Sequence, residues 1–275
     1  MPLTSRRQFI GAAGLALAGA LVARHAAAQA PASGGPVDSA LIDDLVAANR
    51  ILVDQGVLDG YGHVSVRHPA DPQRYLMSRS IAPELVTAAD IMEYDLDSNP
   101  IDARGRESVR ERFIHGEIFK ARPDVNAVVH NHSPSVVPFS VTTVAMRPLF
   151  HMAAFVGEGV PNFEIRDSEK GTDLLVKTPY LGQALAKTLG KSPAALMRGH
   201  GSVTVGESLP RAVGRSVYLE MSARMQLQAI VIAGTGGKIT YLDEQEVRAS
   251  VPGQDYSRAW PMWRAHALAL LKPQV

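Results

Sequence analysis

Apolar residues recur at the spacing of an amphipathic α-helix in several stretches of the chain. The first stretch covers residues 38–56 and has its apolar positions at Leu41, Leu45, Val46, Ile51 and Leu52. Asp38 or Ser39 is suited to cap the start of this helix, and Gly56 is suited to end it. Further helices are predicted over residues 108–121, 133–140, 172–189, 208–233 and, in an amphipathic tail, 256–271.

Short apolar or alternating runs between these helices predict β-strands. They cover residues 64–67, 74–78, 126–132, 194–197 and 238–242. Because strands and helices are interleaved, the pattern favours a layered α/β fold in one domain over residues 38–250. A flexible linker, residues 29–37, precedes that domain, and a helical tail, residues 251–275, follows it. The tail carries Trp260 and Trp263, which we expect to pack on the core or on a neighbouring subunit rather than to form a lid.

The first 28 residues have the pattern of an export signal. Arg6 and Arg7 stand directly before an apolar run, residues 9–22, and small residues follow up to Ala28. A charged start, a short apolar stretch and an A-x-A end are typical of a cleaved signal, and the paired arginines resemble the twin-arginine type. We therefore expect the twin-arginine translocase to deliver the folded protein to the periplasm, without a membrane anchor after cleavage. A retained N-terminal anchor is the alternative.

The composition restricts the possible functions. The net charge is +1, from 28 basic and 27 acidic residues, which argues against a nucleic-acid binder. We expect the partner to be a small-molecule substrate. The chain has no cysteine, so disulfides, thiolate zinc sites, iron–sulfur clusters and cysteine nucleophiles are excluded. Any transition metal must be held by histidine, aspartate or glutamate.

Three histidines follow predicted strands in positions that suit a single metal ion. His130 and His132 are two residues apart on a predicted strand, so their side chains share one face. His200 lies between two glycines, where the backbone can turn sharply after the strand over 194–197. Together they predict a His-based site for a divalent metal with one open position. Each histidine alone could also be an ordinary strand-end or loop residue.

Glu111 lies on the predicted helix that precedes the His-x-His strand. It is four residues from His115, so the two side chains are expected on one helical face. A carboxylate that faces a metal can ligate the ion or transfer a proton. A solvated surface glutamate is the alternative.

These segments resemble the class II aldolase/adducin family over residues 40–245. The likeness rests on E-R-F-I-H from Glu111, A-R-P-D-V-N-A-V-V-H-N-H up to His132, and R-G-H-G around His200. It implies that His130, His132 and His200 bind a divalent metal, usually zinc, with manganese(II) or iron(II) as alternatives. It also implies that Glu111 is the catalytic acid/base. The implied fold is an α/β/α sandwich around a mostly antiparallel sheet, usually assembled as a homotetramer with sites near subunit contacts.

The resemblance implies a metal-dependent carbon–carbon lyase. In such an enzyme the ion chelates adjacent substrate oxygens and stabilises an enediolate, while Glu111 moves the proton to or from carbon. Aldol cleavage and decarboxylation differ in the leaving group but not in how the charge is stabilised.

The chain departs from the sugar-phosphate aldolases in the segments that bind phosphate. There, small neutral donors are replaced by His63, Arg79 and Arg110, with Ser80 beside them, and His151 lies near the place of a family tyrosine. Arginine suits a planar carboxylate, so these residues predict an unphosphorylated substrate that carries a carboxylate. Surface or intersubunit salt bridges are the alternative role for the two arginines.

Two other classes of protein share this family's sequence pattern. One is an iron-dependent oxygenase on the same fold, which dependence on dioxygen would distinguish. The other is a non-catalytic, adducin-like module. The adducin branch lacks the metal histidines, whereas His130, His132 and His200 are all present here.

Overall fold

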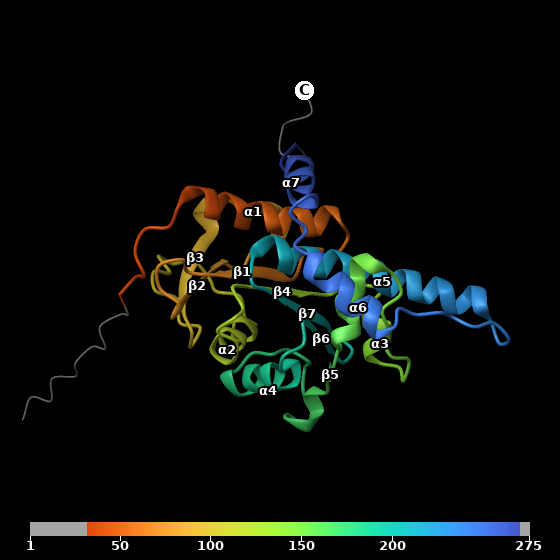
Figure 1. Ribbon diagram of the computed structural model, residues 1–275. Helices are drawn as coiled ribbons and strands as arrows, with labels where there is room; N and C mark the ends of the chain where they lie inside the picture. Colours follow the sequence, from red (N-terminus) through yellow and green to blue (C-terminus); the bar gives the residue numbers. More distant parts are fainter. Residues whose placement is uncertain (1–31, 270–275) are drawn as a thin grey trace, which may run out of the picture. The chain divides into compact units, whose positions relative to one another are not determined.

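The computed structural model describes residues 32–269, which fall within one compact unit (Figure 1). The export signal predicted over residues 1–28 lies outside the described residues. Residues 32–37, the described part of the predicted linker, are neither helix nor strand. Within residues 32–269, no helix combines the length and the apolar character needed to cross a membrane.

Seven strands form one sheet in the order β3-β2-β1-β4-β7-β6-β5. Their bounds are β1 His63–Arg67, β2 Arg74–Ser78, β3 Ile91–Asp95, β4 Ala127–Asn131, β5 Asn162–Phe163, β6 Ala194–Met197 and β7 Gly201–Gly206. All neighbours are antiparallel except the parallel pair β5 and β6. The prediction of a mostly antiparallel sheet is confirmed. In the register of β1, β4 and β7, His63 lies opposite His130 and His130 lies opposite Val203.

Helices cover both faces of the sheet, which confirms the predicted three-layer sandwich (Figure 1). One face packs against α1 (Ser39–Asp54) and α5 (Leu209–Ala233), with α7 (Ala259–Ala269) packed on α1, and the other against α2 (Phe113–Ala121) and α4 (Pro179–Leu189). Two shorter helices are α3 (Val137–Ser140) and α6 (Glu244–Ser250). Single 3₁₀ segments cover Pro83–Leu85, Ala88–Asp90, His151–Glu158, Ile165–Asp167 and Val251–Gly253.

The core is divided by the sheet into two main apolar clusters. Leu45 and Ile51 of α1 are fully buried in the first cluster, together with Trp260 and Trp263 of α7. The two tryptophans therefore pack on the core, one of the two predicted roles. Phe119 and the other apolar residues of α2 and α4 fill the second cluster. Burying each large apolar side chain contributes roughly 1.5–3 kcal/mol relative to exposure, so the core holds the sheet edges firmly.

Two helices begin later than the sequence pattern predicts. The helix expected over residues 172–189 begins at Pro179, because the residue before a proline is disfavoured in helical geometry, and Thr178 caps it instead. The helix expected over residues 108–121 begins at Phe113. Before it, the Arg112 carbonyl accepts hydrogen bonds from the hydroxyl groups of Tyr75 and Ser98, at 3.3 and 3.1 Å. The same carbonyl accepts from the N–H groups of His115 and Gly116, at 3.1 and 3.3 Å, and so also forms the first turn of α2.

The sequence pattern also misassigns the chain after α5. The prediction of a strand over residues 238–242 is wrong. This segment is irregular, and its Leu242 N–H donates a hydrogen bond to the Pro148 carbonyl at 2.9 Å. The next residue, Asp243, caps α6, which has no counterpart among the predicted elements. Strands β3, β5 and β7 have none either, and the helix expected over residues 133–140 is confined to α3.

Candidate metal centre

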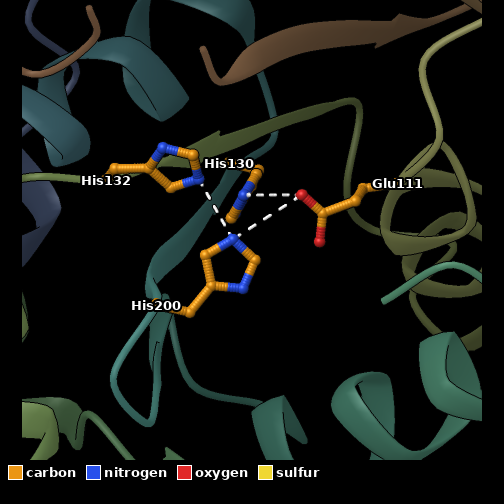
Figure 2. A group of neighbouring side chains, drawn as sticks. All are labelled: Glu111, His130, His132 and His200. Atoms are coloured by element: carbon orange, nitrogen blue, oxygen red, sulfur yellow. Dashed lines mark hydrogen bonds and ion pairs between the residues drawn. The ribbon is translucent and has the colours of Figure 1, made fainter. Parts of the chain in front are cut away.

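Four side chains from separate parts of the chain converge at one end of the sheet (Figure 2). Each offers one ligand atom, and the four atoms lie within 4.8 Å of one another; the residues are Glu111, His130, His132 and His200. The Nε2 atoms of His132 and His200 are 3.0 Å apart. Oε2 of Glu111 is 3.6 Å from Nε2 of both His130 and His200. The structure thus brings together the residues that the sequence analysis connects with metal binding and proton transfer.

The sheet and one tight turn position the three imidazoles. His130 is on β4, His132 follows the end of that strand by one residue, and His200 stands in the turn between β6 and β7. Gly199, in the same turn, has a φ of +66°, which suits glycine. At Gly201 a Cβ atom would collide with the backbone carbonyl of the last residue of β4. Glycine therefore lets β7 start close enough to β4 for the rings to meet.

Backbone carbonyl groups fix the orientation of two of the rings. Nδ1 of His130 lies 3.1 Å from the Ser202 carbonyl oxygen, and Nδ1 of His200 lies 2.9 Å from that of Leu174. Because a carbonyl oxygen only accepts, each Nδ1 carries the hydrogen and each Nε2 presents a lone pair to the centre. Nε2 of His130 is completely buried and has no hydrogen-bond partner among the described residues. A bound cation would satisfy this nitrogen.

Glu111 reaches the centre from just outside α2. It precedes the first helical residue by two positions, and its Oε1 accepts a hydrogen bond from Val176 N–H at 2.9 Å, which leaves Oε2 toward the rings. His115, fully buried, contacts His63 and Ser65 instead. The prediction that Glu111 and His115 share a face of one helix is wrong, because α2 begins at Phe113 and Glu111 lies in the turn before it.

Electrostatics favour an ionised carboxylate at Glu111 and uncharged rings at His132 and His200. Burial opposes the ionisation of Glu111, but the nearby rings of His130 and His200 and the Val176 N–H outweigh it and lower the pKa of Glu111 to about 2. Burial, helped by His130, lowers the pKa of His200 to about 4, and burial also lowers the pKa of His132. Anionic carboxylates and neutral imidazoles are the forms that bind metals.

The donor set fits a divalent transition metal. Three imidazole nitrogens and one carboxylate oxygen, with no sulfur, suit zinc, iron(II) or manganese(II). Three protein nitrogens leave room for substrate oxygens, which a catalytic site requires. Across residues 32–269, no second cluster of this composition occurs.

Two of the predicted substrate residues lie at the same end of the sheet. His63 faces His130 from the neighbouring strand, with ring centroids 5.0 Å apart. Arg79 directly follows β2, whose antiparallel pairing with β1 brings it to the level of His63. The Nε of Arg79 donates to Asp90 at 2.6 Å, so a salt bridge holds this guanidinium, as in the alternative role considered for it.

The remaining predicted substrate residues show no bond to the centre. Ser80 and Arg110 are exposed, and His151 is exposed at the start of a 3₁₀ segment. In the described part of the chain, no hydrogen bond or ion pair connects the side chains of these three residues with the four converging groups. Their contact with substrate remains a prediction.

The groups that orient the side chains of the centre were not predicted from the sequence. Ser202, Leu174 and Val176 act through backbone atoms, and a backbone contact leaves no signature in residue type. Tyr61 is also missed: it is 72% exposed, and its ring centroid is 6.4 Å from that of His132. An aromatic residue two positions before His63 was the available signal.

Comparisons with known proteins agree with this geometry. The decarboxylase tropJ of Talaromyces stipitatus is 34% identical over 241 residues, covering 79% of this chain and 90% of that protein. A 3,4-dihydroxyphthalate decarboxylase of Arthrobacter keyseri is 28% identical, covering 74% and 83%. The L-fuculose 1-phosphate aldolase structure from Glaciozyma antarctica shares the fold, with a TM-score of 0.69, 23% identity, and coverage of 86% and 95%.

The family model described as "Class II Aldolase and Adducin N-terminal domain" matches residues 43–227. This range contains Glu111, all three converging histidines and all seven strands of the sheet, from β1 to β7. The chain therefore belongs to the class II aldolase and adducin family.

Proposed function

We propose that this protein is a metal-dependent decarboxylase that acts on a hydroxylated carboxylate, most simply an aromatic one with two adjacent hydroxyl groups. The observation that carries the proposal is the convergence of Glu111 with three metal-competent histidines within 4.8 Å. Support for a carboxylate comes from His63, which lies opposite His130 with the two ring centroids 5.0 Å apart. Further support comes from relatives that are named decarboxylases.

The chemistry requires charge stabilisation and one proton transfer. Loss of carbon dioxide leaves an electron pair on carbon, and a proton must take the place of the carboxylate. His130, His132 and His200 would hold the divalent ion, which when bound supplies a Lewis acid for adjacent substrate oxygens. Glu111 is ionised and lies 3.6 Å from the Nε2 atoms of His130 and His200. It is placed to accept a proton from a substrate hydroxyl and to deliver it to the carbon.

We further propose that zinc is the physiological ion and that the protein works in the periplasm as a homotetramer. The nitrogen-rich donor set supports zinc, and elemental analysis of protein purified from its native compartment tests it. The paired Arg6 and Arg7 support export. Replacing both by lysine should leave the protein in the cytoplasm when cells are fractionated, and delivery to the periplasm without the pair would contradict the export route.

The decisive experiment compares substrate classes on the metal-loaded protein. We expect release of carbon dioxide from 3,4-dihydroxyphthalate and no cleavage of L-fuculose 1-phosphate. Chromatography of the products measures both reactions. His266→Ala is a suitable control variant, because this exposed histidine contacts Asp54 on α1 and bonds none of the four converging groups.

Three outcomes separate the candidate functions. Turnover of the sugar phosphate alone would contradict a carboxylate substrate. Product formation that requires dioxygen and iron(II) would favour the oxygenase. Absence of turnover across hydroxylated acids, with metal bound, would favour a non-catalytic module.

A further inference from the structure

A row of three buried polar side chains leads from the interior of the sheet to the metal centre. Ser65 Oγ lies 2.5 Å from Nδ1 of His115, and Nε2 of His115 lies 2.6 Å from Nδ1 of His63. Ser65 and His115 have no exposed surface, and His63 is 5% exposed. None of the three belongs to the converging group of Glu111 and three histidines.

The direction of the two hydrogen bonds follows from the donors that need a partner. If the Ser65 hydroxyl donates to His115, then His115 Nε2–H donates to His63 Nδ1, and every hydrogen on these atoms is used. In the opposite direction Nδ1–H of His115 would donate to Ser65. The enclosed Ser65 hydroxyl hydrogen would then lack an acceptor, since its contact with His115 is its only hydrogen bond among the described residues. A buried donor without an acceptor is destabilising, so the first direction is favoured.

This direction makes His63 a neutral donor at its other nitrogen. With Nδ1 accepting from His115, the ring hydrogen of His63 is on Nε2. Nε2 has no hydrogen-bond partner among residues 32–269 and is not among the enclosed unpaired atoms, so it remains open to a ligand.

The position of His63 places this donor beside the bound substrate. Its ring centroid is 4.8 Å from that of His115 on one side and 5.0 Å from that of His130 on the other. His130 is a candidate metal ligand, so a substrate chelated there lies next to His63. An N–H group in such a place suits an anionic oxygen, because hydrogen bonds to charged acceptors are the stronger ones.

We propose that Ser65 and His115 are positioning residues that fix His63 as an Nε2–H donor, and that this donor binds a carboxylate oxygen of the substrate. The second half of the proposal rests on the proposed decarboxylase function. The first half concerns only the direction of hydrogen bonds within the protein and stands apart from it.

The tautomers can be measured directly by nitrogen-15 NMR of the histidine rings in the zinc-loaded protein. We expect both His63 and His115 as Nε2–H tautomers. In Ser65→Ala, where the fixed donor is gone, both tautomers of His115 should be populated. Ser216→Ala is the matched control, because Ser216 is also fully buried and bonds Thr204 at 2.5 Å, outside the row. A wild-type His63 with its hydrogen on Nδ1 would overturn the assigned direction.

The ligand contact is tested with two probes that differ by carboxylate groups, 3,4-dihydroxyphthalate and catechol. His63→Leu should raise the KM for 3,4-dihydroxyphthalate about 10- to 100-fold, as expected for a lost hydrogen bond to a charged group. Its effect on inhibition by catechol, which has no carboxylate, should be less than about twofold. His63→Gln retains an N–H donor and should recover most of the affinity for the carboxylate. His115→Phe should also raise the KM for 3,4-dihydroxyphthalate, but by less than His63→Leu does.

The outcomes distinguish failure of this inference from failure of the proposed function. Equal weakening of both probes in His63→Leu would show a structural role and overturn the carboxylate contact. If wild-type protein neither binds nor converts 3,4-dihydroxyphthalate or any other hydroxylated acid, the proposed function fails and the carboxylate contact fails with it. The NMR result still decides the direction of the row in that case.

Discussion

At the scale of single residues, the centre is prepared for a cation by contacts outside it. Backbone carbonyls hold Nδ1 of His130 and His200 and so aim the Nε2 lone pairs inward. A ring fixed in this way loses little freedom when it binds a metal, and such outer contacts typically affect affinity 10- to 100-fold. The centre therefore depends on residues that contribute no metal ligand.

Glu111→Gln provides the sharpest test of the proton-transfer role. Glutamine keeps the size of the side chain but removes the basic oxygen, so decarboxylation should fall by at least about 100-fold. Three histidines remain, so the protein should still retain about one metal ion per chain, measured by elemental analysis. His132→Ala is the contrasting variant and should lose metal and activity together. Activity close to wild type in Glu111→Gln would remove this residue from the mechanism.

The residues of the site were largely predictable from the sequence, but the contacts between them were predictable only in part. The two-residue spacing of His130 and His132 on a strand fixes a shared face, and the structure has them together. The four-residue spacing of Glu111 and His115 predicts a shared face only if both residues lie in the helix. Glu111 lies before it, and the two side chains enter different networks.

At the scale of elements, the meeting of β4 and β7 sets the geometry of the centre. His130 comes from one of these strands and His200 from the turn that enters the other. The two strands pair from Asn131 opposite Ser202 to Ala127 opposite Gly206. Any change that separates the strands at the His130 end should therefore act on the metal site as well as on stability.

Gly201→Ala tests this coupling. The added methyl group would collide with the backbone carbonyl of Asn131, and backbone cannot move aside as a side chain can. We expect a loss of about 1–3 kcal/mol in the free energy of unfolding, measured by urea titration, together with weaker zinc binding. Gly236→Ala is the matched control, since a Cβ there meets nothing within 4 Å. Unchanged stability and zinc affinity in Gly201→Ala would contradict the role given to this contact.

Elements with a clear apolar period were predicted well, and those defined by tertiary contacts were not. The helices α1 and α5 follow their patterns, with caps at Asp38 and Ser208. Strand β7 begins with Gly-Ser and contains Thr204, so its sequence lacks the apolar run that marks a buried strand. It forms because β4 and β6 pair with it on both sides, information that no local pattern contains.

At the scale of the whole molecule, the fold should persist without its metal. Two large apolar clusters lie on opposite faces of the sheet, and neither is built around the centre. Treatment with a chelator should abolish decarboxylation while the far-ultraviolet circular dichroism spectrum stays unchanged. Adding zinc back at about 100 times its dissociation constant should raise Tm by about 5–10 °C. Unfolding on chelation would show that the metal is structural.

The exposed end of α5 bears on the proposed homotetramer. Val231 and Ile232 are 80% and 85% exposed, and Figure 1 shows this end of α5 extending beyond the sheet. Large adjacent apolar side chains in water are typical of a covered surface, and we propose that a second copy of the chain covers it. Val231→Asp should lower the mass measured by light scattering, while Leu85→Asp, at another exposed apolar position, should not. A wild-type protein that is monomeric would contradict this proposal.

The packing of α7 against α1 has a consequence for synthesis. Trp260 and Trp263, near the end of the described chain, complete the apolar cluster that Leu45 and Ile51 begin near its start. A nascent polypeptide on the ribosome cannot complete this layer until α7 has emerged. Products truncated before α7 should consequently expose an apolar face that chaperones and proteases recognise.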